Sequence, residues 1–130
     1  MSLRVRQLRA RATAIGAVLL IGGLALVQGG AWAHAFVSRS EPPSGSLMAV
    51  PLSRVRIWFD GPVERSFLAM RVEDRDRQRV DKGDAHVDAR DATMIEVGVP
   101  ALQPGRYRVF WSVIARDGHR RDGDFSFRVK

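Results

Sequence analysis

The sequence predicts a small all-β domain, either an immunoglobulin-like sandwich or a Greek-key β-barrel of about seven strands. From residue 54 onward, apolar residues alternate with polar ones in several short runs, which is the period of two expected of half-buried strands. Clusters of Gly, Pro and Asp separate these runs, and no sustained helical period follows residue 33. Seven short strands in about 100 residues are typical of two-sheet folds of this kind.

The first 33 residues are predicted to be a secretory signal peptide and not part of the fold. Four arginines precede an uncharged apolar run at 14–27, and Ala31-Trp32-Ala33 follows as a cleavage site. The apolar run is shorter than the roughly 20 residues of a spanning helix, although an uncleaved membrane anchor is the alternative. The absence of an Arg-Arg pair before this run favours the general secretory route. Cleavage would give a mature domain of residues 34–130 that begins at His34.

The strands of the mature domain are predicted from the alternating runs. Those with clear alternation have their apolar faces at Val55/Ile57/Phe59, Leu68/Met70/Val72, Ile95/Val97/Val99, Tyr107/Val109/Trp111/Val113 and Phe125/Phe127/Val129. Two weaker strands are expected at 35–40 and 46–50. Turn signals between the runs include Asp60-Gly61-Pro62, Asp117-Gly118 and Asp122-Gly123. The charged stretch 73–91 is expected to be a long exposed connection or hairpin, and the core candidates are Phe59, Tyr107, Trp111, Phe125 and Phe127.

The net charge of the chain is concentrated in the segment that is removed. The 130 residues contain 21 Lys+Arg and 14 Asp+Glu, a net charge of +7, but the mature 97 residues keep 17 Lys+Arg and a net charge of +3. The remaining arginines alternate with apolar residues or are interleaved with acidic ones, as at 71–79, so no stripe of one sign indicates nucleic-acid binding. The lack of cysteine excludes disulfides, thiolate metal sites and cysteine nucleophiles.

Two features of the mature chain could bind a metal ion. The free α-amine and the imidazole Nδ1 of a terminal His34 can chelate one ion, a pair of nitrogen donors that favours Cu(II) or Ni(II), with copper preferred by the Irving–Williams order. Asp117 and His119 lie two residues apart around Gly118, directly after the predicted aromatic strand, and would complete a set of three nitrogens and one oxygen. An incidental chain end and an ordinary polar hairpin turn are the alternatives.

These residues carry a family resemblance. The segments 34–45, 55–59, 104–111, 117–119 and 123–129, with the sequences HAFVSRSEPPSG, VRIWF, PGRYRVFW, DGH and GDFSFRV, resemble the periplasmic copper-resistance protein CopC (also PcoC) family. The similarity extends from His34 to Lys130. It implies a Greek-key β-barrel of immunoglobulin-like type and a high-affinity site for one Cu(II) ion, with His34, Asp117 and His119 as ligands.

The chain departs from some family members in its methionines. Those members carry a loop rich in methionine and histidine that binds Cu(I), but the stretch 72–91 here has no methionine. Met48, Met70 and Met94 are isolated and are expected to pack in the core, so we predict binding of Cu(II) alone. Asp60 is a weak candidate for a place beside the copper, and His86 is expected to be solvent-exposed and without a partner.

The function implied is that of a periplasmic Cu(II)-binding protein for copper resistance or homeostasis, soluble and monomeric, which sequesters the ion or delivers it to an inner-membrane copper transport protein. It is not expected to be an enzyme or to bind nucleic acid. The alternative is a copper-dependent oxidative enzyme with an N-terminal histidine site, such as a polysaccharide monooxygenase. A third possibility, an interaction module without metal, would make His34 and His119 incidental.

Overall fold

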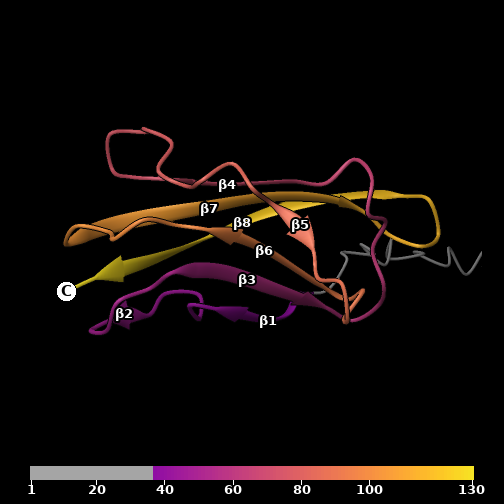
Figure 1. Ribbon diagram of the computed structural model, residues 1–130, viewed down its shortest axis with the longest axis horizontal. Helices are drawn as coiled ribbons and strands as arrows, with labels where there is room; N and C mark the ends of the chain where they lie inside the picture. The colour runs from indigo at the N-terminus through magenta and orange to yellow at the C-terminus, as the bar shows by residue number, and fades with distance from the viewer. Residues whose placement is uncertain (1–36) are drawn as a thin grey trace, which may run out of the picture. The chain divides into compact units, whose positions relative to one another are not determined.

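The computed structural model describes residues 37–130, which fold into two four-stranded sheets that face each other (Figure 1). The strands are β1 (Val37–Glu41), β2 (Leu47–Met48), β3 (Arg54–Phe59), β4 (Ala69–Glu73), β5 (His86–Val87), β6 (Met94–Gly98), β7 (Gly105–Ile114) and β8 (Arg120–Val129). This part of the chain contains no helix, and therefore none that could cross a membrane. The predicted signal peptide and His34 lie outside the described residues.

The first sheet has the strand order β1-β3-β6-β5, with every neighbouring pair antiparallel. The second has the order β2-β8-β7-β4, in which the short β2 pairs with β8 in parallel and the other neighbours are antiparallel. The long hairpin of β7 and β8 keeps an unbroken register from Gly105 opposite Val129 to Ile114 opposite Arg120. It therefore carries the turn at residues 115–119 to one end of the sandwich.

The core lies between the sheets and consists of the side chains that the alternation predicts to point inward. Val55 and Ile57 of β3 are fully buried, as are Val109 and Val113 of β7. The Phe59 ring meets the Trp111 ring edge-on at a centroid distance of 5.1 Å, which joins the two sheets by an aromatic contact. Tyr107, Trp111, Phe59 and Phe127 are buried as predicted, whereas Phe125 is only partly buried.

The predicted immunoglobulin-like sandwich is confirmed, as two separate sheets with Greek-key-like connections and not as a closed barrel. The weak strands predicted at 35–40 and 46–50 correspond to β1 and to the shorter β2. Met70 and Met94 are buried, as predicted, and Met48 packs partly against the core.

The stretch 73–91 contains a short hairpin, as predicted, closed by the bridge between Glu73 and Arg79, but it also contains the strand β5, which was not predicted and pairs with β6. One prediction of a turn was wrong. Asp122-Gly123 is not a turn, because both residues lie inside β8, where Gly123 is opposite Trp111. The physical reason at Gly123 is close packing, since a Cβ there would lie 2.7 Å from Cζ2 of Trp111.

Candidate metal centre

The turn between β7 and β8 presents the predicted ligands Asp117 and His119. The turn is closed by two backbone hydrogen bonds, from the Gly118 N–H to the Ala115 carbonyl at 2.9 Å and from the Ala115 N–H to the His119 carbonyl at 3.0 Å. Gly118 has a φ of +83°, in the left-handed region that glycine adopts without steric cost. The predicted Asp-Gly turn is therefore present and fixes the backbone on both sides of Gly118.

The side chains of Asp117 and His119 lie together on this turn. Nδ1 of His119 is 3.3 Å from Oδ2 of Asp117, and the His119 N–H donates a 2.9 Å hydrogen bond to Oδ1 of Asp117. The His119 side chain is 79% exposed and that of Asp117 is 49% exposed, so an ion in solution can reach both. One imidazole nitrogen and one carboxylate oxygen are donors that suit a divalent transition metal.

The surroundings favour the charged form of Asp117. The backbone hydrogen bond from His119 lowers the pKa of the Asp117 carboxyl below its ordinary value, and the His119 side chain and the positive charge of Arg121 act in the same direction. The carboxylate is therefore deprotonated near neutral pH, which is the form that coordinates a metal ion.

Arg121 is a neighbour of this pair that the sequence reasoning missed. Its Nη2 lies 2.9 Å from Oδ2 of Asp117, and its side chain is only 14% exposed. The signal was available in the strand pattern, because Arg121 has the same parity as Phe125, Phe127 and Val129 and so occupies an inward register position. An arginine in an apolar register is unusual enough to indicate a specific partner.

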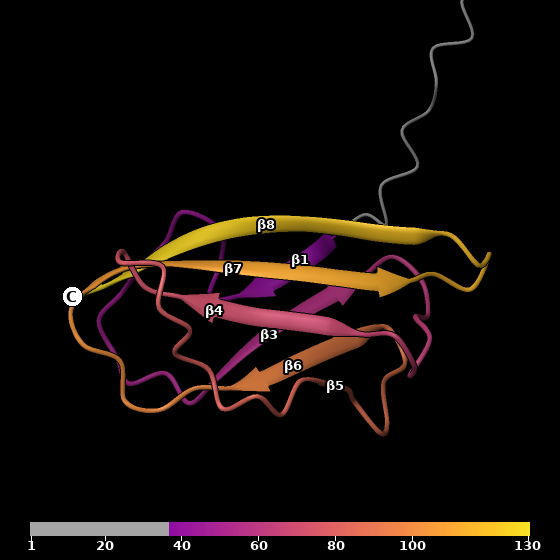
Figure 2. The same cartoon turned by 90° about the horizontal axis from the view of Figure 1, so that it is seen from above.

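The start of β1 lies at the same end of the sandwich as this turn. Val37, the first residue of β1, pairs with Phe59 at the end of β3. A few residues after Phe59, Val63 forms a bridge with Ala115 at the start of the turn. Figure 2 shows the start of β1, the end of β3 and the β7–β8 turn at one end of the molecule. The described chain thus begins three residues after His34 at the end that carries Asp117 and His119.

The described residues supply two of the predicted ligands and not a complete site. Within 37–130, no group of three or more His, Asp or Glu side chains is arranged to hold a metal ion. Asp60 is exposed and directly follows Phe59, so it lies at the same end of the sandwich as the turn. His34, the other residue of the predicted ligand set, lies outside the described range.

His86 lies on the other sheet, and the prediction that it has no partner was wrong. Its Nε2 is 3.2 Å from Oε1 of Glu96, and its Nδ1 is 2.8 Å from the Asp84 carbonyl, although the side chain is exposed as predicted. The physical reason is the unpredicted strand β5, whose pairing with β6 sets His86 directly opposite Glu96. Arg54 and Arg56 also bind Glu96, so this cluster is an ion-pair network on the outer face of the sheet.

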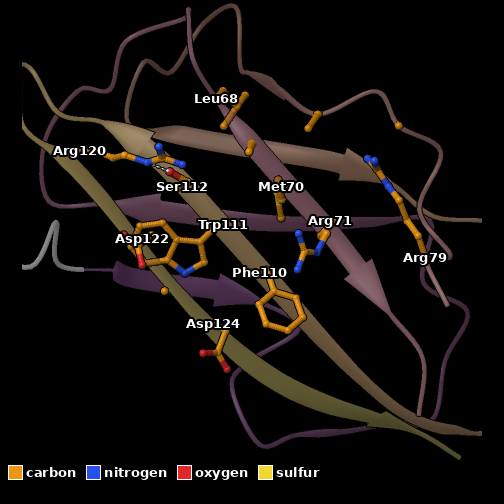
Figure 3. A pocket seen from close by; sticks show the side chains of 14 residues that line it. Leu68, Met70, Arg71, Arg79, Phe110, Trp111, Ser112, Arg120, Asp122 and Asp124 are labelled. Carbon is orange, nitrogen blue, oxygen red and sulfur yellow. Dashed lines mark hydrogen bonds between the residues drawn. The ribbon is translucent and has the colours of Figure 1, made fainter. Parts of the chain in front are cut away.

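A shallow hollow on the outer face of the second sheet is separate from the candidate metal ligands. Figure 3 shows it between β4, β7 and β8, with Arg71 beside the Phe110 ring and Arg120 bonded to Ser112. Neither Asp117 nor His119 lines this hollow. The candidate ligands therefore lie on an open turn and not in an enclosed substrate pocket.

The fold and this turn define a class: small β-sandwich domains that present a histidine and a carboxylate side by side at one end. The sequence model of the CopC domain family matches residues 37–130, and the chain belongs to that family. The resemblance noted from the sequence is confirmed.

Curated relatives and solved structures agree with this membership. Protein YobA of Escherichia coli K12 is 26% identical over 106 residues, which is 81% of this chain and 86% of YobA. Copper transport protein CutJ of Bacillus subtilis is 26% identical over 113 residues, which is 86% of this chain but 21% of CutJ.

CopC of Methylosinus trichosporium OB3b superimposes with a TM-score of 0.69 at 27% identity, covering 75% of this chain and 94% of that one. PcoC, a methionine-rich copper resistance protein of E. coli, gives a TM-score of 0.65 at 23% identity over 75% of this chain and 100% of that one, which supports the fold alone.

Proposed function

We propose that this protein binds one Cu(II) ion per chain in the periplasm, for copper resistance or homeostasis. In this proposal residues 1–33 are removed, residues 34–130 form the working domain, and the ligands are the α-amine and imidazole of His34 with Asp117 and His119. The observation that carries it is the juxtaposition of the start of β1 with the Asp117–His119 turn at one end of the sandwich.

The short connection between His34 and β1 supports this ligand set. Three residues of extended chain span at most about 10 Å, so the terminal amine of a chain that begins at His34 must stay close to the start of β1. The pairing of Val37 with Phe59 and the bridge from Val63 to Ala115 tie that point to the turn. The terminus would then add its two nitrogens to a histidine and a carboxylate that are already adjacent.

The donor types support copper as the ion. Two imidazoles, an amine and a carboxylate suit Cu(II) among the divalent first-row metals, whereas Cu(I) prefers thiolate and thioether sulfur. The chain has no cysteine, and Met70 and Met94 are buried in the structure. The name of CutJ, a relative that is 26% identical over 113 residues, describes a copper transport protein.

A carrier fits this site better than an enzyme. Four protein donors would fill the positions around Cu(II) that an oxygen-activating enzyme leaves open, and the two described ligands lie outside the hollow of the second sheet. A polysaccharide monooxygenase remains the alternative function, and cleavage of chitin or cellulose driven by hydrogen peroxide would identify it. The match to a fifth of CutJ supports a copper transport protein as the partner that receives the ion, and in this proposal that partner lies in the inner membrane.

The test is a Cu(II) competition titration of mature protein, residues 34–130, with His119→Ala and His86→Ala as a matched pair. His119→Ala removes a proposed ligand and should weaken binding by at least tenfold, with fewer nitrogen donors in the paramagnetic resonance spectrum. His86→Ala removes an exposed histidine on the other sheet and should leave the Cu(II) affinity unchanged. Equal affinity in the His119→Ala variant and the parent protein would show that the proposed site is wrong.

A further inference from the structure

Arg121 occupies a position where an apolar side chain is expected. It pairs with the fully buried Val113 across the β7–β8 hairpin and has the same parity as the buried Phe127. Its side chain is only 14% exposed, so a full positive charge lies mostly beneath the surface. Burying a charge costs free energy unless a partner of opposite charge compensates it.

The partner that compensates Arg121 is the proposed copper ligand Asp117. Nη2 of Arg121 lies 2.9 Å from Oδ2 of Asp117, the same oxygen that faces Nδ1 of His119. The Nε of Arg121 is buried and has no hydrogen-bond partner among the described residues. The Asp117 carboxylate is therefore the counter-ion of the buried guanidinium.

We propose that Arg121 competes with Cu(II) for the charge of Asp117, and so weakens the affinity of the site and speeds release of the ion. This inference rests on the proposed function and deepens it, because it assigns the site to delivery of copper and not to tight storage. A guanidinium bonded to a ligand oxygen repels a divalent cation that binds the same carboxylate. It also withdraws electron density that the oxygen would otherwise donate to the metal.

The opposite role, in which Arg121 strengthens binding by holding Asp117 in place, is disfavoured by the turn itself. Oδ1 of Asp117 already accepts a hydrogen bond from the His119 N–H, and Gly118 closes the turn through the Ala115 carbonyl. The carboxylate thus keeps its orientation without Arg121. Removing the guanidinium should therefore change the electrostatics of the site more than its geometry.

The experiment compares Arg121→Met, Arg121→Lys and Arg108→Met in the mature protein. Methionine has a flexible unbranched side chain that fills the space of the arginine stem, and the buried Nε forms no bond within residues 37–130 that would be lost. Arg108 is a matched control, since its Nε is 2.7 Å from Oδ2 of Asp124 on the same hairpin, away from the turn. The Arg108→Met variant loses the same charge from an Arg–Asp pair that is more exposed than the pair of Arg121 with Asp117.

We expect Arg121→Met to bind Cu(II) at least tenfold more tightly and to release it more slowly to a chelator, with a shift in the parallel g value of the paramagnetic resonance spectrum. Arg121→Lys keeps the charge and should remain within about threefold of the parent protein. Arg108→Met should match the parent in affinity, release rate and spectrum. Circular dichroism and thermal unfolding establish whether each variant is folded. If Arg121→Met does not fold, Arg121→Gln serves as the neutral variant.

The inference is overturned if the folded neutral variant binds Cu(II) with unchanged or weaker affinity, or if Arg108→Met tightens binding equally. Failure of the proposed function has a different signature, because Asp117→Asn in the parent protein would then leave Cu(II) affinity unchanged. If Asp117→Asn weakens binding and Arg121→Met does not strengthen it, the ligand set stands and the competing role of Arg121 is wrong.

Discussion

Gly123 shows at the scale of one residue how packing can override a local turn signal. Asp-Gly is a strong hairpin motif, yet here it lies inside β8 because the Trp111 indole packs over the glycine. The distances from a Cβ at this position would be 2.7 Å to Cζ2 and 3.0 Å to Cε2 of Trp111. Trp111 also meets Phe59 of the facing sheet, so it has little freedom to move away.

We therefore predict that Gly123→Ala destabilises the domain by about 1–3 kcal/mol, the usual cost of forcing extra volume into a packed site. Gly61→Ala is the matched control, because a Cβ there meets nothing within 4 Å, and it should change the free energy of unfolding by less than about 0.5 kcal/mol. Urea unfolding followed by tryptophan fluorescence measures both. Equal stability of the two variants would mean that the Trp111 side chain can shift to accommodate the added methyl group.

The candidate ligands show what a residue-scale pattern can and cannot predict. Asp117 and His119 were predictable because a turn of three residues with a central glycine fixes their proximity. The ion pair between Arg121 and Asp117 depends on Arg121 facing inward on β8. That orientation was predictable, because Arg121 has the same parity as Phe125 and Phe127. The pairing of His86 with Glu96 was not predictable, because these residues are ten apart in the chain and meet only through the register of β5 against β6.

At the scale of elements, the segment that links β4 to β5 is organised by one buried carboxylate. Asp81 accepts hydrogen bonds from the backbone N–H groups of Val72 and Gly83, and its oxygens also bind Arg79. Its side chain is fully buried. Burial alone would raise the pKa of the Asp81 carboxyl, but the bonds from Arg79, Val72 and Gly83 more than offset this effect and lower it.

This depressed pKa predicts a pH-dependent contribution to stability. The contribution of Asp81 is fully present above the unfolded pKa of about 3.9 and is lost as the pH falls through the lower folded pKa. We expect Asp81→Asn to be less stable than the parent by about 1–3 kcal/mol at pH 7, with the gap narrowing below about pH 4. Asp76→Asn changes an exposed residue, so its free energy of unfolding should follow that of the parent protein at every pH. Urea titrations at several pH values measure the parent protein and both variants.

The strands with clear alternation were predicted because burial of one sheet face imposes a period of two on the sequence. The edge strands β2 and β5 contain two residues each, too few to show a period, so their existence depends on the neighbours β8 and β6. This is why residues 73–91 were expected to form an exposed connection or hairpin, without a strand that joins the first sheet. Position within a sheet, and not local propensity, decides the structure of such short segments.

At the scale of the whole molecule, the sandwich brings together segments that are far apart in the sequence. The start of β1, the residues after β3 and the β7–β8 turn meet at one end, joined by the pairing of Val37 with Phe59 and of Val63 with Ala115. The proposed site would therefore form only when the fold is complete and the chain begins at the correct residue. Folding and processing of the N-terminus are both conditions for copper binding in this proposal.

The dependence on processing leads to a prediction that uses the mature protein and a version with one added methionine before His34. The addition converts the α-amine of His34 into an amide, which removes a nitrogen donor while leaving Asp117, His119 and the whole described fold unchanged. We expect Cu(II) affinity to fall by at least tenfold, with the same thermal unfolding midpoint in the absence of metal.

The pH dependence of the same two proteins separates the contribution of the terminus from that of the turn. The α-amine and imidazole of His34 must lose their protons to bind, so the affinity of the mature protein should decline as the pH falls through about 8 to 6.5, the ordinary range in which such terminal groups take up protons. The extended protein lacks the free amine beside the imidazole and should show a shallower decline over the upper part of this range. Competition titrations from pH 6 to pH 9 measure both curves, and identical affinities and slopes would mean that the ion binds without the terminus of His34.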